Sequence, residues 1–210
     1  MKIITGSSLY ELMKYGENID KDIKKNDIKS IERKVETKTT EYVTVLFFQK
    51  NFMALSTALF LIMISWVFIT FTILRILNIK HSPALHFSLY MALTMIYIFI
   101  YIGAVFLIAR GITTGVKMIY FTFVFIVCVA CIFSLYYLVR IYWVEGSYNE
   151  NIFHIAMLLL PLYFSRLILN TTLIRTAIMW TINERARKAY WKIFMKDYKS
   201  PRKIRKLRVG

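Results

Sequence analysis

One arginine lies inside an apolar segment and shares a helical face with two other polar side chains. Arg166 follows the run Pro161-Leu-Tyr-Phe-Ser and precedes Leu-Ile-Leu-Asn170. At 100° per residue, Tyr163, Arg166 and Asn170 fall within about 60° of one another on a helix. A guanidinium near the bilayer centre costs roughly 2.5–3.5 kcal/mol on insertion scales, so it rarely faces lipid. These three residues form a candidate intramembrane site that faces a partner or a ligand.

The interaction that satisfies the charge of Arg166 is left open by the sequence. None of the predicted spans contains Asp or Glu, so no intramembrane carboxylate of this chain is available. The remaining possible partners of its guanidinium are backbone carbonyls, Tyr or Asn side chains, water, a lipid phosphate, or a carboxylate of another subunit. A second interpretation is that the segment is shallow and that Arg166 snorkels to a headgroup. A third interpretation is that Arg166 lines a transport pathway. Proton-coupled transport is disfavoured, however, because arginine does not release its proton.

The C-terminal segment combines high positive charge with a periodic apolar face. From Arg175 onward it carries twelve Lys/Arg against two acidic residues, a net charge of +10 in 36 residues. This pattern is typical of an amphipathic helix that lies on an anionic inner leaflet. Lipid is favoured over an acidic protein partner or nucleic acid, because a membrane-tethered tail meets lipid at high local concentration. The candidate lipid-binding residues are Arg185, Arg187, Lys188, Trp191, Lys192 and Lys196.

Other reactive residue types lack the spacing that catalysis or metal binding requires. Cys128 and Cys131 form a CxxC pair by spelling, but they lie mid-span, and no second cysteine pair is present to exchange electrons with them. The three histidines show no metal-ligand spacing. The segment 110–117 contains two glycines and is interpreted as a tight turn rather than an anion-binding nest. No nucleophile–base pair or carboxylate pair occurs, so we expect a non-enzymatic protein without a cofactor or metal site.

The elements that position these residues are predicted from long uncharged runs. No Asp, Glu, Lys or Arg occurs in the 24 residues between Lys50 and Arg75, the 29 between Lys80 and Arg110, or the 22 between Lys117 and Arg140. About 20 helical residues cross a bilayer core of roughly 30 Å, so each run can form a span. Four transmembrane helices are expected, at about 52–74, 84–109, 118–139 and 152–174.

The fold class expected is therefore an all-α integral membrane protein with three regions. Residues 1–50 form a mostly helical cytoplasmic N-terminal region, in which Gly16 ends a first helix and a second runs from Ile19 to Val35. Residues 51–175 form the four-helix transmembrane domain, and residues 176–210 form the basic cytoplasmic tail with an amphipathic helix. We expect no cleavable signal peptide at the N-terminus, and we expect the first span to serve as the insertion signal.

The distribution of basic residues predicts the orientation. With both termini inside, the inner segments hold 24 Lys/Arg and the outer loops hold three. Because basic residues are concentrated in cytoplasmic segments, both termini are expected in the cytoplasm of a multi-pass cell inner membrane protein.

Two functional hypotheses follow from this reading. The first is an interaction protein of the inner membrane: an accessory subunit, or an immunity- or exclusion-type protein that blocks an incoming partner. Its expected partners are the anionic inner leaflet and an unidentified membrane protein or further copies of the chain. The alternative is a small oligomeric channel or transporter in which the face formed by Tyr163, Arg166 and Asn170 lines the path.

Overall fold

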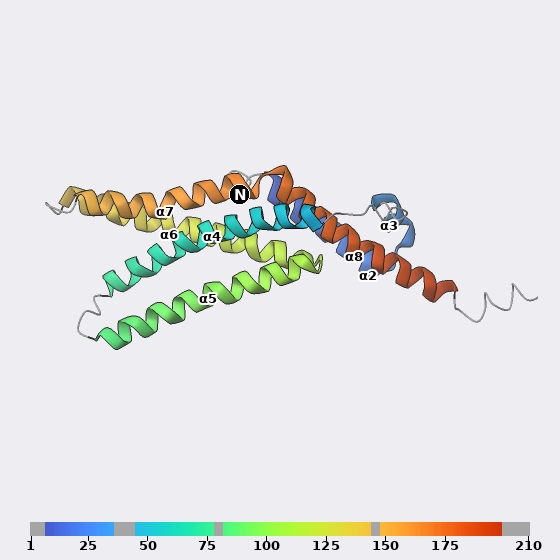
Figure 1. The fold of residues 1–210 in the computed structure, drawn as a ribbon, viewed down its shortest axis with the longest axis horizontal. Helices are drawn as coiled ribbons and strands as arrows, with labels where there is room; N and C mark the ends of the chain where they lie inside the picture. Colours follow the sequence, from blue (N-terminus) through green and yellow to red (C-terminus); the bar gives the residue numbers. More distant parts are fainter. Residues whose placement is uncertain (1–6, 36–44, 78–81, 144–147, 199–210) are drawn as a thin grey trace, which may run out of the picture.

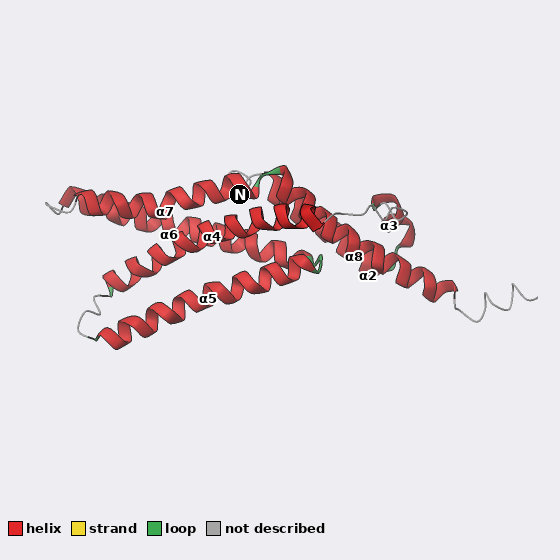
Figure 2. Cartoon of the chain, in the orientation of Figure 1, coloured by secondary structure: helices red, strands yellow, loops and turns green. Residues whose placement is uncertain are grey.

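The protein is helical throughout the residues that its structure describes. The computed structural model describes residues 7–35, 45–77, 82–143 and 148–198. Within these ranges there are seven helices and no strand (Figure 2). The helices are α2 (Ser7–Lys25), α3 (Ile28–Lys34), α4 (Val45–Ile76), α5 (Pro83–Ala109), α6 (Thr113–Trp143), α7 (Tyr148–Leu169) and α8 (Thr172–Tyr198). The predicted tail residues beyond 198 lie outside the described residues.

Four of these helices are long and apolar enough to cross a membrane. They comprise 25 residues of α4 (Phe52–Ile76) and the whole of α5, α6 and α7, with 27, 31 and 22 residues. About 20 helical residues cross a bilayer core of roughly 30 Å. The predicted bundle of four transmembrane helices is confirmed, and the chain is a polytopic membrane protein.

The fourth transmembrane helix ends earlier than the predicted span, which extended to residue 174. Helix α7 stops at Leu169, and α8 starts at Thr172 in a new direction (Figure 1). The Asn170 side-chain Nδ2 donates to the Arg166 carbonyl at 2.8 Å, and Thr171 Oγ1 donates to the Ile168 carbonyl at 2.7 Å. Such local bonds from Asn and Thr side chains compete with the helical ladder and favour a helix end.

Helices α4 and α7 form the most extensive contact of the bundle. One series of buried positions on α4 recurs in steps of three and four residues, as in a coiled-coil seam. It comprises Leu55, Ala58, Ile62, Ser65, Ile69 and Thr72, and Leu59, Thr70 and Leu74 are buried as well. The buried positions Leu158, Leu162, Ser165 and Leu169 of α7 follow the same spacing. Small side chains in both seams let membrane helices approach closely, which explains why this pair packs best.

Helix α5 is the least buried of the four spans and contacts α4 and α6. Two aromatic side chains join α4 and α5 through backbone carbonyls. Trp66 Nε1 donates to the Leu93 carbonyl at 3.0 Å, and Tyr97 Oη donates to the Leu59 carbonyl at 2.7 Å. Figure 1 shows that α5 runs apart from the close α4–α7 pair. Much of its surface is therefore available to lipid or to another protein.

The prediction that Gly16 ends the first helix is wrong, because α2 continues through Gly16 to Lys25. A Cβ atom at this position would lie 2.5 Å from Oγ1 and 2.7 Å from Cγ2 of Thr113. Gly16 therefore permits a close contact between α2 and the start of α6. The chain turns instead at Asn26, which has φ 53°, and Asp27 then caps α3 by accepting a bond from the Ser30 backbone N–H at 3.1 Å.

Figure 1 shows α2, α3, α8 and the turn between α5 and α6 at the same end of the bundle. We call this the basic end. A chain with an even number of spans returns to the side where it started, so both terminal helices lie at one end.

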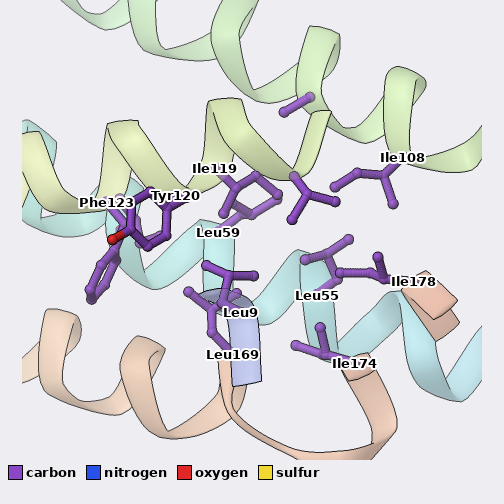
Figure 3. Close-up of a cluster of buried hydrophobic side chains, with 14 of the residues drawn as sticks. Leu9, Leu55, Leu59, Ile108, Ile119, Tyr120, Phe123, Leu169, Ile174 and Ile178 are labelled. Carbon is purple, nitrogen blue, oxygen red and sulfur yellow. The ribbon is translucent and has the colours of Figure 1, made fainter. Parts of the chain in front are cut away.

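A buried apolar cluster joins the basic end to the transmembrane helices. Figure 3 shows side chains of α2, α4, α5, α6, α7 and α8 that meet there. The members include Leu9, Leu55, Leu59, Ile108, Ile119, Leu169, Ile174 and Ile178. Since all of these are almost completely shielded, α2 and the first half of α8 belong to the folded core.

Candidate functional site

Helix α2 is clamped onto the basic end by apolar and ionic contacts. Leu9, Leu12 and Ile19 on its inner face are buried. Around them, three carboxylates of α2 reach three cations of other helices. Glu11 Oε2 lies 3.7 Å from Arg175 Nη2, Glu17 Oε1 lies 2.8 Å from Lys117 Nζ, and Asp20 Oδ1 lies 2.7 Å from Arg185 Nη1.

The surroundings of α2 change the pKa of two of its side chains. Tyr15 Oη donates to Asn183 Oδ1 at 2.6 Å, and burial raises the pKa of the Tyr15 hydroxyl. The hydrogen bond from Lys117 lowers the pKa of the Glu17 carboxyl below its usual value of 4.5. Glu17 therefore stays charged at neutral pH and contributes to the attachment of α2 to α6.

We expect the attachment of α2 to weaken in acid because of this pair. A lowered pKa means that the contribution of Glu17 is present above pH 4.5, declines below it, and is gone under the folded-state pKa. Both side chains are more than a third exposed, so the pair stabilises α2 by at most about 1 kcal/mol, or roughly fivefold in protection. Hydrogen exchange of residues 7–25 in nanodiscs, corrected for intrinsic rates, measures this loss.

Lys117→Met supplies the control for the exchange experiment. It removes the cation and should reduce α2 protection at neutral pH while making the remaining protection less dependent on pH. An unchanged pH profile in this variant would show that the Glu17–Lys117 pair does not hold α2.

A cavity of about 450 Å³ lies between the α5–α6 turn and α8 at the basic end. Its lining includes Arg110, Thr181, Arg185 and Lys188. The turn passes very close to α8: Gly111 has φ +69°, and a Cβ atom there would lie 2.2 Å from the Thr181 carbonyl oxygen. Only glycine fits this left-handed position at such a close approach.

The second half of α8 carries an exposed surface in which aromatic and basic residues adjoin. Trp191, Phe194 and Met195 have 49%, 42% and 47% of their surface exposed. Trp191 packs edge-on to Phe194 at a centroid distance of 5.8 Å. Lysines at 188, 192 and 196 follow the helix beside them at i, i+4 and i+8, and all three are exposed. We call the six residues Lys188, Trp191, Lys192, Phe194, Met195 and Lys196 the distal surface.

The candidate intramembrane residues lie at the basic end of α7. Arg166 is in the last turn of α7, partly buried, and Asn170 lies just beyond the helix end. Tyr163 is 54% exposed on the outside of the bundle. None of the three lines the cavity of about 450 Å³. A path along this face could form only between copies of the chain, and its role as a partner-facing or ligand-facing site stays a prediction.

The candidate lipid-binding residues divide into two groups. Arg185 is held by Asp20 at 2.7 Å and by the Gly111 carbonyl at 3.3 Å, and Arg187 pairs with Glu184. Lys188, Trp191, Lys192 and Lys196 are exposed and belong to the distal surface. Lipid binding by these residues stays a prediction.

The cysteines and the described histidines lie apart from the basic end. Cys128 and Cys131 are free thiols, exposed on α6. His154 stacks on Tyr137 at a centroid distance of 5.1 Å, near the opposite end of the bundle. Among the described residues, no group of three or more His, Cys, Asp or Glu side chains could hold a metal ion. His81 lies outside the described residues.

Comparison of the chain with protein-family models, with curated proteins and with solved structures found no match.

Sequence reasoning missed the clamp formed by α2 and the cavity beside Arg110. The net charges gave no signal for the clamp, because residues 1–50 carry ten Lys/Arg against eight Asp/Glu and the tail has a net charge of +10. The contact depends on individual carboxylates of α2 that face cations of α6 and α8. No signal marked the cavity either, because it depends on how α8 crosses the α5–α6 turn.

Proposed function

We propose that this chain is a non-enzymatic multi-pass protein of the cell inner membrane that acts through protein–protein contacts at the bilayer. Both of its termini are assigned to the cytoplasm. The orientation rests on the basic residues, since 24 of the 28 Lys/Arg fall in the terminal segments and the 110–117 turn.

The observation that carries the proposal is the distal surface of α8. Figure 1 shows α8 leaving the basic end and extending away from the transmembrane bundle. Arg185 contacts the Gly111 carbonyl in the α5–α6 turn. At a rise of 1.5 Å per residue, Trp191 lies about 9 Å farther along α8, so the exposed aromatic strip lies beyond the ends of the transmembrane helices. Contiguous exposed apolar surface in water marks an interaction site.

The charge of this surface favours, as its occupant, an acidic segment of a partner protein that also has an apolar face. The aromatic strip supplies buried contact area, and the adjacent lysines supply attraction for carboxylates. The chain adds six further basic residues and no acidic residue between 199 and 210. The anionic leaflet is the competing occupant, and the experiment below separates the two.

A photo-crosslinking amino acid placed at Trp191 in the full-length protein tests the proposal in native membranes. We expect a discrete protein adduct that disappears when Lys192→Glu and Lys196→Glu are added. Lys24→Glu with Lys25→Glu on α2 makes the same charge change at the same end, and the adduct should persist there. A crosslinker at the exposed Tyr142, near the opposite end, should not give this adduct.

Two outcomes would contradict the proposal. A lipid adduct at Trp191 without a protein adduct would assign the surface to the leaflet, especially if anionic nanodiscs protect residues 188–198 from hydrogen exchange and neutral nanodiscs do not. A protein adduct that still forms in the Lys192→Glu, Lys196→Glu variant would show that the partner does not bind through acidic residues.

The conditions under which the adduct forms also distinguish an accessory subunit from an immunity- or exclusion-type protein. An accessory subunit would crosslink to a resident membrane protein in unchallenged cells. An immunity- or exclusion-type protein would crosslink only when the incoming protein is supplied.

A further inference from the structure

The cavity at the basic end brings cations of two helices to the level where the transmembrane bundle ends. It lies between α8 and the turn that follows Ala109, the last residue of the second span. Its volume of about 450 Å³ is within the range of about 300–1,000 Å³ for small-molecule sites. Lining residues include Arg110, Ile112, Trp180, Arg185 and Lys188.

The charge of the cavity is positive after its internal pairs are accounted for. Asp20 pairs with Arg185, and Glu184, the carboxylate in the lining, pairs with Arg187 and with Lys188. Lys188 Nζ lies 3.7 Å from Glu184 Oε1, but its side chain is 76% exposed and free to turn toward a ligand. Arg110 forms no ion pair with any described residue; its guanidinium lies 4.2 Å from the ring centroid of Phe106. The cavity is therefore suited to an anion.

An exposed apolar stripe on α5 leads directly to Arg110. Phe99, Ile102 and Phe106 precede it by eleven, eight and four residues, so all four share one helical face. The three apolar side chains are 72%, 57% and 52% exposed. An amphiphile with its apolar chain along this stripe would place its charged group at Arg110. A free phosphate ion would leave the stripe unused.

We propose that this cavity binds the phosphate headgroup of an anionic phospholipid, with an acyl chain along the α5 stripe. Arg110 and Lys188 contact the phosphate, and the fixed Arg185 adds positive potential. Basic pockets between membrane helices at the cytoplasmic boundary recognise such headgroups. Lys188 belongs to both the cavity and the distal surface, but the site does not require protein docking, because Arg110 follows the last residue of α5 and the apolar stripe lies on that helix.

The test uses full-length protein purified in neutral detergent and titrated with phosphatidylglycerol or phosphatidylcholine, with lipid-bound species counted by native mass spectrometry. Phosphatidylglycerol should bind the wild type in preference to phosphatidylcholine. Arg110→Ala with Lys188→Ala should weaken phosphatidylglycerol binding roughly 30-fold, from the expected value of each basic contact. Lys192→Ala with Lys196→Ala removes the same charge from α8 outside the cavity and should change binding less than twofold.

Further variants test the site without changing Arg110, in case Arg110→Ala disturbs folding. Lys188→Glu alters a solvent-exposed side chain and should weaken phosphatidylglycerol binding at least tenfold. Phe99→Ser with Ile102→Ser should weaken it as well, while glycerol phosphate should bind poorly to every variant. Equal losses of phosphatidylglycerol binding in the cavity and control variants would show that binding depends on the overall charge of the protein and not on the cavity. Wild-type binding of glycerol phosphate as tight as that of the phospholipid would overturn the assignment to a membrane lipid.

Discussion

Replacing Gly115 with alanine should destabilise the protein far more than the same change at Gly103. A Cβ atom at residue 115 would lie 2.7 Å from the Ala104 carbonyl oxygen, 2.8 Å from the Ile108 nitrogen and 2.8 Å from Leu107 Cβ. Two of these atoms are backbone of α5, so no side-chain rotation relieves the clash, and α5 must move away from α6. Overpacking of this kind costs about 1–3 kcal/mol, which lowers the Tm of a chain this size by roughly 2–12 °C.

Gly103→Ala is the matched control for this measurement. It adds the same methyl group in the neighbouring span, where the nearest atom is Met118 Cε at 3.7 Å, an ordinary contact. Thermal unfolding in detergent should show a Tm close to that of the wild type for Gly103→Ala. If the two variants unfold at the same temperature, α5 and α6 do not approach as closely as the structure has them.

The transmembrane architecture could be predicted from the sequence because it depends on local composition. Each uncharged run exceeds the length that a bilayer requires, and this requirement applies whatever the helices contact. The end of α7 could not be predicted in the same way. Leu173 and Ile174 are apolar again after Asn170, Thr171 and Thr172, yet the helix ends at Leu169, where the Asn170 and Thr171 side chains bond to carbonyls of the preceding turn.

The helix boundary in the N-terminal region was missed for a different reason. Glycine often ends helices, but at position 16 the missing side chain allows α2 to pack closely against Thr113. The same residue type serves both purposes, and only the neighbouring helix distinguishes them. A single sequence does not show that α6 passes there.

The candidate sites were likewise predicted where they depend on local sequence and missed where they depend on distant residues. The periodic face of the tail was visible, but its inner positions Ile182 and Ala186 pack into the protein core instead of facing outward. The exposed aromatic and basic positions of the second half of α8 begin at Lys188. Arg110 was assigned to a tight turn, and its position at a cavity depends on Trp180 and Lys188, some 70 residues later in the chain.

Reporter fusions should show an all-or-none pattern that fixes the orientation of the bundle. Alkaline phosphatase fused after Lys80 or after Gly146 should be active, and fusions after Gly111 or Gly210 should be inactive. The enzyme matures only outside the cytoplasm, and basic segments are retained inside. Gly111 lies in the α5–α6 turn at the basic end, together with α2 and α8, so the structure requires the fusions after Gly111 and Gly210 to behave alike.

Green fluorescent protein at the same four positions provides the reciprocal control, because it becomes fluorescent only in the cytoplasm. The complete inverse pattern would keep the bundle but place the basic end outside, which contradicts the positive-inside assignment and the cytoplasmic partner of the distal surface. A difference between Gly111 and Gly210 would mean an odd number of spans after α5. Because α8 pairs with α2 through Arg185 and Asp20 at 2.7 Å, that outcome would also exclude the contact between the two terminal helices.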